Sequence, residues 1–325
     1  MTVFTRRRVV ALGATAVALP SSLRAQANWP TSPVTFVVGY APGGSSDING
    51  RELAAVMSPI LGQQIVVDNK GGANGSVGAR VVANAKPDGY TLFYATAQAI
   101  VVNPHIQKGS IDTIAALVPV CQTTAYQYVL AVNPKVPANT VAELVALARK
   151  DPDKLTYSSA GVGGGNHTAG ALFVEATGIR MTHVPYKGTG PALADVISGQ
   201  ITMEFSTLPS AVPQIKVGNL KALAVTGNQR LKSLPDVPTL REQGIDVTQY
   251  GWHGLFAPAK TPNVHLDKIE KDAKQAMKDP KWEEALAKDG VDLPPERSRA
   301  EFARYVADEH AFWGKKLKAM KIDLE

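Results

Sequence analysis

Short runs of β-branched and aromatic residues alternate with longer amphipathic segments through the first part of the chain. The runs at residues 34–40, 64–68 and 90–95 have the length and composition of strands, and residues 48–60 and 76–85 have apolar positions at helical spacing. Strands that alternate with helices are typical of parallel sheets in α/β folds. The pattern therefore predicts one α/β unit in this part of the chain.

The same order of elements begins again at a further strand-like run over residues 128–132. A helix is predicted over 140–150, a strand over 155–159, a helix over 168–177 and a strand over 183–186. These segments predict a second α/β unit of similar build. No low-complexity linker separates the units, which favours extended crossing segments over a flexible tether.

The last part of the chain has a different pattern. Pro258 and Pro262 interrupt it, and two amphipathic helices are predicted after them, over residues 265–288 and 298–320. Their many lysines and glutamates are most simply interpreted as a solvated outer face.

Residues 1–27 have the features of an export signal. Arginines at residues 6–8 precede the uncharged run 9–23, and residues 25–27 match a small-residue cleavage site. The apolar run is too short to span a bilayer. We expect export to the periplasm by the Sec or the Tat route, because the arginines suit both.

Charge and composition exclude several classes of protein. The chain has 325 residues, 45% of them hydrophobic and 19% charged, with a formal net charge of +6. Residues 1–27 hold four arginines and no acid, so the remaining chain has a net charge of only +2. Basic residues do not alternate with aromatic ones in a groove-like run, so no nucleic acid is expected as a partner. A single cysteine, Cys121, cannot form an internal disulfide, and its apolar neighbours predict a buried side chain.

Four glycine-rich turns carry the candidate chemistry, and each follows a predicted strand and precedes a predicted helix. They cover residues 42–47, 71–76, 161–168 and 187–190. Ligands of α/β proteins bind at the carboxyl ends of strands, and free N–H groups at helix N-termini attract anions. Ser46, Ser76 and Thr168 are predicted to cap these helices. The first and third turns contain no lysine or arginine, so an anion there would be held by main-chain and hydroxyl donors.

Signatures of enzymes are mostly absent from the sequence. It contains no GxxxxGK[ST] or HExxH motif and no serine in a G-x-S-x-G context, and the glycines at 161–165 miss the dinucleotide pattern at its last glycine. The six histidines are scattered, so we expect neither a metal site nor a cofactor. An exported hydrolase or isomerase is the rival hypothesis, although no nucleophile and base have a recognisable spacing.

Five motifs follow one another in a specific order along the chain. They are PGGSSD at 42–47, DNKGGANGSVG at 68–78, PDGYTL at 87–92, VPYKG at 184–188 and LPDVPT at 234–239. Together they closely resemble the solute receptors of tripartite tricarboxylate transporters, the Bug family, over essentially the whole chain after residue 27. The resemblance implies a periplasmic protein that closes on a small carboxylate and delivers it to a membrane permease.

The fold that this resemblance implies is α/β, with the two-domain architecture of periplasmic binding proteins (the Venus flytrap) joined by crossing strands. The first domain is expected to hold residues 28–126 and 255–325, and the second domain residues 127–254. The chain then crosses between the domains at residues 128–132 and near residues 252–256. We expect these crossings to contain the hinge.

The resemblance also implies the ligand-binding residues and no catalytic ones. A ligand carboxylate is held by donors of the first domain, while the second domain sets the identity of the rest. The expected first wall is Tyr40, Gly43, Gly44, Ser45, Ser46, Asp47, Gly75, Ser76 and Ala97, and the expected second wall is Gly163, Gly164, Gly165, Asn166, His167, Gly188, Thr189 and Ser206. Asp47 is expected to orient its loop rather than contact an anion.

The chain departs from the family pattern at two positions. Gly71 stands where a proline usually follows Asn69-Lys70, and Ser206 replaces a common aspartate. If residue 206 faces the cleft, a partner for an ammonium or hydroxyl group is lost. Dicarboxylates, hydroxy acids or aromatic acids are then favoured over amino acids. We expect a monomer that works with permease subunits, and a periplasmic sensor that reports the same ligand to a signalling partner is the alternative.

Overall fold

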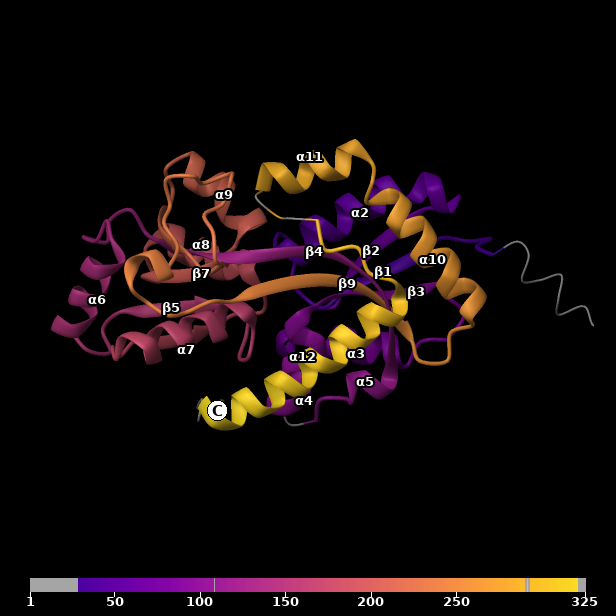
Figure 1. The fold of residues 1–325 in the computed structure, drawn as a ribbon, viewed down its shortest axis with the longest axis horizontal. Helices are drawn as coiled ribbons and strands as arrows, with labels where there is room; N and C mark the ends of the chain where they lie inside the picture. Colours follow the sequence, from indigo (N-terminus) through magenta and orange to yellow (C-terminus); the bar gives the residue numbers. More distant parts are fainter. Residues whose placement is uncertain (1–28, 108, 290, 292, 321–325) are drawn as a thin grey trace, which may run out of the picture.

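The computed structural model describes residues 29–320 apart from residues 108, 290 and 292 (Figure 1). The predicted export signal at 1–27 lies outside the described residues. In chain order the elements are β1 (Val34–Val38), α2 (Ser45–Leu61), β2 (Ile65–Asn69), the 3-10 turn η1 (Ala73–Gly75), α3 (Ser76–Ala83), β3 (Thr91–Thr96), the π-helical turn η2 (Gln98–Val102), α4 (Asn103–Ile106), α5 (Thr113–Ala116), β4 (Leu117–Val132), α6 (Val141–Lys150), β5 (Thr156–Ser159), α7 (Gly165–Thr177), β6 (Thr182–Pro185), α8 (Thr189–Ser198), β7 (Met203–Thr207), α9 (Leu208–Lys216), β8 (Lys221–Val225), the 3-10 turn η3 (Arg241–Gln243), β9 (Tyr250–Pro258), α10 (Asn263–Ala276), α11 (Pro280–Asp289) and α12 (Arg299–Met320).

The strands of the described chain form one curled nine-stranded sheet. Their order is β2-β1-β3-β9-β4-β7-β5-β6, and β8 pairs with β4. In the first half, β1 pairs in parallel with β2 and β3; in the second half, β5 pairs in parallel with β6 and β7. Both predicted α/β units are therefore present, each with a parallel core of strands.

Two long strands join the two halves of the sheet. β4 has 16 residues, of which the first part pairs with β9, residues 128–132 pair with β7, and residues 129–132 also pair with β8. Figure 1 shows β4 and β9 running from one lobe to the other. This arrangement agrees with two α/β domains joined by crossing strands. The predicted domain boundaries at 126/127 and 254/255 fall inside β4 and β9 and stay predictions.

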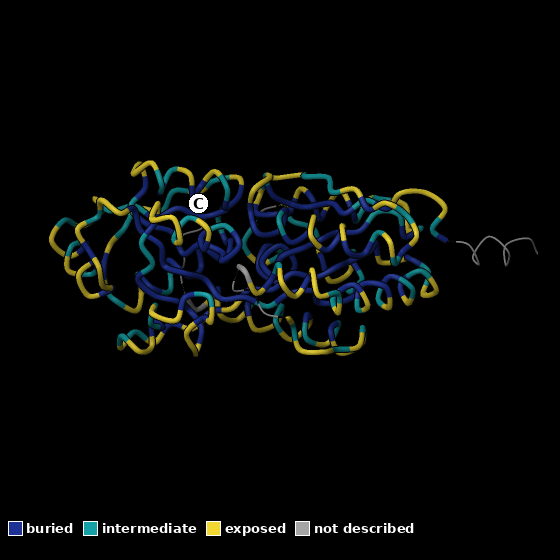
Figure 2. The backbone as a smooth tube through the Cα atoms, turned by 90° about the horizontal axis from the view of Figure 1, so that it is seen from above, coloured by how far each residue is buried: buried dark blue, intermediate teal, exposed yellow. Residues whose placement is uncertain are grey.

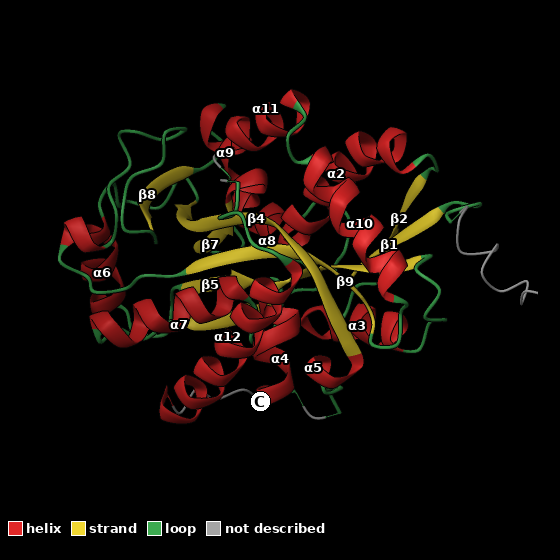
Figure 3. Ribbon diagram, turned by 45° about the vertical axis from the view of Figure 1, so that its right-hand side comes forward, coloured by secondary structure: helices red, strands yellow, loops and turns green. Residues whose placement is uncertain are grey.

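Helices cover both faces of the first domain's strands. In Figures 1 and 3, α2, α10 and α11 lie on one side and α3 and α12 on the other. α12 packs against β4 and η2, and its Phe302 is fully buried with Trp252 and Phe256. In Figure 2 the buried backbone runs through the interior of the molecule, and the exposed backbone lies mostly along its outer edge. The C-terminal helices thus combine the predicted solvated face with an apolar face.

The structure corrects the prediction of one helix over residues 265–288. Two helices, α10 and α11, occupy this segment, and α11 begins at Pro280. Proline has no N–H to continue a preceding helix, and it disfavours helical geometry in the residue before it. The break allows α11 to turn away and contact both α2 and α9.

The capping prediction for Ser46, Ser76 and Thr168 is also wrong. The N-caps of α2, α3 and α7 are glycines, and none makes a side-chain capping hydrogen bond. The predicted residues lie inside the first turn of each helix, so their hydroxyls are not placed ahead of it. No cap side chain therefore accepts a hydrogen bond from the first-turn N–H groups of these helices.

One further sequence-based expectation concerns the burial of Cys121. Cys121 is 2% exposed, as predicted, and burial raises the pKa of its thiol to about 12. Within the described ranges, no helix combines the length and the apolar character that crossing a membrane requires.

Candidate functional site

A cavity lies between the two domains, beside the crossing strand β4. It has about 330 Å³ of empty space, its mouth included. It is lined by Tyr40, Gly44, Ser45, Ser46, Asn74, Thr96, Gln98, Tyr126, Tyr128, Ala160, Gly165, Asn166, Thr189 and Thr207. None of these lining residues carries a charged side chain.

Three helices begin at this cavity. The first residues of α2, α7 and α8 are Ser45, Gly165 and Thr189, and all three line the wall. A Cβ added at Gly44, the cap of α2, would lie 3.7 Å from the backbone N of Thr189, so the starts of α2 and α8 are adjacent. First-turn N–H groups have no carbonyl partner within their helix, and the helix dipole adds partial positive charge. The arrangement suits an anion that is held without a lysine or arginine.

Tyr40 organises the wall of the first domain. Its hydroxyl donates to Asn74 Oδ1 at 3.0 Å and lies 2.9 Å from Thr96 Oγ1. Asn74 Nδ2 in turn donates to Asn103 Oδ1 at 2.8 Å. Burial raises the pKa of Tyr40 above its ordinary value, so its hydroxyl stays protonated. These bonds fix polar groups at the wall before any ligand arrives.

Asp47 lies behind the first glycine turn. Its Oδ2 accepts from the backbone N of Gly43 at 3.0 Å, and its Oδ1 accepts from Arg51 Nε at 2.9 Å. Partial burial opposes ionisation, yet the hydrogen bonds from Arg51 and Gly43 lower the pKa of Asp47 below its ordinary value. The contacts hold the turn, which agrees with the orienting role expected of Asp47.

Asn166 is held from behind by strand β7. Its Nδ2 donates to Glu204 Oε1 at 2.8 Å and to the carbonyl O of Phe205 at 2.7 Å. Glu204 is fully buried, and burial raises the pKa of its carboxyl well above the ordinary value. The neutral form of Glu204 is therefore favoured in the folded protein.

The crossing strand β4 contributes two tyrosines to the wall. The rings of Tyr126 and Tyr128 meet edge to face with centroids 5.5 Å apart, and Gln98 Nε2 donates to Tyr128 Oη at 3.2 Å. A Cβ at Gly165 would lie 1.7 Å from Tyr128 Oη, so α7 can begin this close to β4 only with glycine.

The structure brings part of the predicted site together. The predicted residues that line the cavity are Tyr40, Gly44, Ser45, Ser46, Gly165, Asn166 and Thr189. Those that do not are Gly43, Asp47, Gly75, Ser76, Ala97, Gly163, Gly164, His167, Gly188 and Ser206. Lining residues that the sequence reasoning missed are Asn74, Thr96, Gln98, Tyr126, Tyr128, Ala160 and Thr207. Contact of any of them with a ligand stays a prediction.

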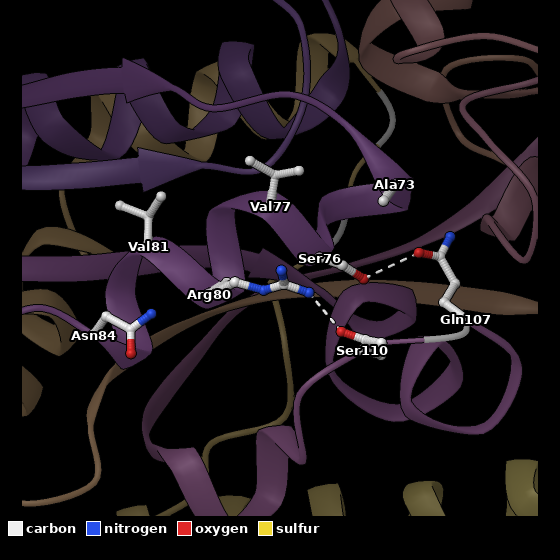
Figure 4. A pocket seen from close by; sticks show the side chains of 9 residues that line it. Ala73, Ser76, Val77, Arg80, Val81, Asn84, Gln107 and Ser110 are labelled. Carbon is white, nitrogen blue, oxygen red and sulfur yellow. Dashed lines mark hydrogen bonds between the residues drawn. The ribbon is translucent and has the colours of Figure 1, made fainter.

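Ser76 faces a different hollow, on the outer surface beside α3 (Figure 4). Its hydroxyl donates to Gln107 Oε1 at 3.3 Å and accepts from Asn103 Nδ2 at 3.0 Å. This hollow has about 800 Å³ of empty space, and Arg80 at its side donates to the carbonyl O of Gly109. Its lining comes from the first domain, so closure of the two domains would not enclose a ligand there.

His167 and Ser206 also lie away from the cavity wall. His167 Nδ1 accepts from the backbone N of Gly163 at 2.9 Å, and its ring stacks on His183 with centroids 3.9 Å apart. Burial lowers the pKa of His167 to about 4, so this side chain is neutral at pH 7. The Ser206 hydroxyl is buried and has no hydrogen-bond partner among the described residues. Among all the residues that the structure describes, no three His, Cys, Asp or Glu side chains form a group that could hold a metal ion.

Comparisons with known proteins agree on one family. The model of the tripartite tricarboxylate transporter family receptors matches residues 50–322. A UPF0065 protein of Agrobacterium vitis is 38% identical over 288 residues, which are 87% of this chain and 82% of that protein. The structure of periplasmic binding protein BugD has 32% sequence identity and a TM-score of 0.87, and the match covers 90% of this chain and 99% of that one.

Two further solved structures contain carboxylates. The R. palustris protein Rpa4515 with adipate has 30% identity and a TM-score of 0.86, with 90% of this chain and 98% of that one covered. MatC from Rhodopseudomonas palustris with bound malate has 29% identity and a TM-score of 0.84, with 88% and 99% covered.

Proposed function

The chain belongs to the receptor family of tripartite tricarboxylate transporters, and we propose that it captures a small organic carboxylate between its two domains and delivers it to the permease of such a transporter. Receptors of this family are periplasmic solute-binding proteins rather than enzymes. Export by the signal at residues 1–27 would place this receptor there.

One observation carries the proposal. The N-termini of α2, α7 and α8, from both domains, meet at one cavity that has no charged side chain in its lining. Oriented N–H groups can hold a carboxylate, and ligation from both sides would favour the closed arrangement. The relatives that contain adipate and malate support this ligand class.

The two domains meet beside the cavity through hydrogen bonds to main-chain carbonyl groups. The backbone N of Ala41 donates to the carbonyl O of Lys187 at 3.3 Å, and Ser210 Oγ donates to the carbonyl O of Gly43 at 3.4 Å. These contacts would break if the domains move apart to admit a ligand. Binding would close the domains again, and the closed form is what the permease would recognise.

The direct test is a thermal-shift screen of the chain after residue 27 with mono-, di- and tricarboxylates. A ligand at 100 times its Kd adds about 2.7 kcal/mol to the free energy of unfolding. A response only to neutral sugars or to cations would contradict the proposal.

The position of the site is tested by Ser46→Ala, with Ser198→Ala on the exposed last turn of α8 as control. We expect weaker carboxylate binding only for Ser46→Ala, because Ser46 lines the cavity. Delivery is tested by uptake of the identified carboxylate into cells with the permease, with and without the receptor.

A further inference from the structure

The side-chain amide of Asn166 has a fixed orientation. One of its two N–H groups donates to the carbonyl O of Phe205, which can only accept a hydrogen bond. The other donates to Glu204 Oε1. If the amide were turned over, Asn166 Oδ1 would face the carbonyl oxygen of Phe205 at hydrogen-bond distance, and the two acceptors would repel each other. The main-chain carbonyl of Phe205 therefore fixes which end of the Asn166 amide is nitrogen and which is oxygen.

This orientation leaves Asn166 Oδ1 as the group that the side chain offers to the cavity. Asn166 lines the cavity wall, and no described residue donates a hydrogen bond to its Oδ1. This oxygen is also not one of the sealed polar atoms that lack a partner in the described chain. An acceptor that remains accessible at a cavity wall selects a donor from whatever fills the cavity.

The acceptor also restricts where a carboxylate can lie. An ionised carboxylate is acceptor-only, so it is repelled from Asn166 Oδ1. The adjacent starts of α2 and α8, at Ser45 and Thr189, offer first-turn N–H groups that can donate to a carboxylate. A carboxylate therefore fits best at α2 and α8, and a hydrogen-bond donor of the same ligand fits at Asn166.

A hydroxyl meets this requirement better than an ammonium group does. The lining of the cavity contains no carboxylate that could balance an ammonium charge. Glu204 lies behind Asn166 and is favoured in its neutral form. Burial of an ammonium group without a counter-charge costs far more than burial of a hydroxyl that has a hydrogen-bond acceptor.

We propose that the cargo is a hydroxy acid, whose carboxylate lies at the N-termini of α2 and α8 and whose hydroxyl donates to Asn166 Oδ1. The proposal rests on the proposed function and narrows its ligand class. Glu204 is then a positioning residue: it accepts from Asn166 and does not itself reach the cavity wall.

Matched pairs of acids test the proposal by isothermal titration of the intact protein. The pairs are succinate with malate, glutarate with 2-hydroxyglutarate, and propionate with lactate, and aspartate serves as the ammonium analogue of malate. In the pair of suitable length, we expect the hydroxy acid to bind on the order of tenfold more tightly than its partner, as one added hydrogen bond implies. Aspartate should bind more weakly than malate.

The variant Asn166→Ala should reduce this preference to about one, whereas the exposed control Asn219→Ala should keep it. If Asn166→Ala does not fold, the comparison of acids on the wild-type protein decides alone.

The outcomes separate the two proposals. Three results would overturn the hydroxyl proposal and leave the proposed function standing. They are binding of carboxylates with no preference for the hydroxy acid, a preference that survives Asn166→Ala, and tighter binding of aspartate than of malate. Failure of every carboxylate to bind would overturn both.

Discussion

Gly190 lies in the first turn of α8, where the second domain meets the glycine turn of the first. A Cβ at this position would lie 2.9 Å from the carbonyl O of Pro42 and 3.4 Å from the carbonyl carbon of Gly43. The substitution Gly190→Ala therefore obstructs the approach of the domains. It leaves the backbone of α8 itself in a geometry that alanine favours.

The expected magnitude follows from this contact. A Cβ needs several tenths of an ångström more room, and the neighbouring atom is backbone rather than the flexible end of a side chain. Overpacking of this kind costs about 1–3 kcal/mol. If the closed state alone bears that cost, carboxylate affinity falls by roughly 5- to 150-fold. Without ligand, the helix propensity of alanine should leave stability unchanged or raise it by up to about 1 kcal/mol.

For Gly190→Ala, isothermal titration measures the change in carboxylate affinity, and urea denaturation without ligand measures the change in stability. The control Ala194→Gly changes an exposed position of the same helix. It should lower stability by about 1 kcal/mol and leave affinity unchanged, which is the opposite pattern. Wild-type affinity in Gly190→Ala would show that Pro42 does not pack against α8 in the bound state, and the closure geometry described above would be wrong.

Three further predictions concern stability. Burial lowers the pKa of His253 to about 3. The contribution of neutral His253 to the free energy of unfolding is therefore complete above its ordinary pKa of 6.5 and is lost as the pH falls from 6.5 toward 3. In urea denaturation at pH 7, 5.5 and 4, His253→Gln should lose less stability than the wild type as the pH falls. Burial raises the pKa of Glu204 above its ordinary value of 4.5. The contribution of neutral Glu204 to the free energy of unfolding is therefore complete below pH 4.5 and is lost as the pH rises. Glu204→Gln should gain stability relative to the wild type between pH 4.5 and 8, and a difference in the free energy of unfolding that stays constant with pH would contradict this. Phe302→Ala should lower the free energy of unfolding by about 3–5 kcal/mol because Phe302 is fully buried, whereas Phe312→Ala, at a side chain that is 55% exposed, should change it by no more than about 0.5 kcal/mol.

Up to residue 186, the order of most strands and helices was predictable because it depends on local periodicity. Runs such as residues 34–40 and 155–159 alternate with helical spacing in the sequence, and the parallel pairing of strands follows from that order. Helix ends were less predictable. The break before Pro280 and the start of α7 at Gly165 depend on single backbone positions within otherwise continuous helical patterns.

The cavity wall was predictable where it follows the ends of strands. Thr96, Ala160 and Thr207 obey the same rule as the glycine turns, since each ends or directly follows a parallel strand. No glycine cluster marks Thr96 or Thr207, and Ala160 directly precedes the glycine turn at 161–168. Tyr126 and Tyr128 lie in the middle of a strand. They reach the cavity because β4 pairs with partners more than 70 residues away, and no local pattern encodes that pairing.

Ser76 shows the opposite failure. It follows a glycine turn and begins a helix, as the rule requires, yet its hydroxyl is bonded to Asn103 and Gln107 on the far side of that helix. Which way a first-turn side chain faces depends on what packs against it. In this region the packing comes from η2 and α4, which the sequence did not reveal as elements.

The pairing of β4 with β9 ends where Gln127 lies opposite Tyr250. The chain therefore leaves the first lobe and returns to it through adjacent positions of one two-stranded ribbon. The segment between Gln127 and Tyr250 is therefore one continuous insertion, joined to the rest of the chain at these two adjacent positions. Recombination at these two positions would replace the cavity wall of the second domain, while the wall with the proposed anion-binding turn would be inherited intact. In a receptor with this path of the chain, exchange of the segment between two matched junctions would change the ligand specificity without a change of fold.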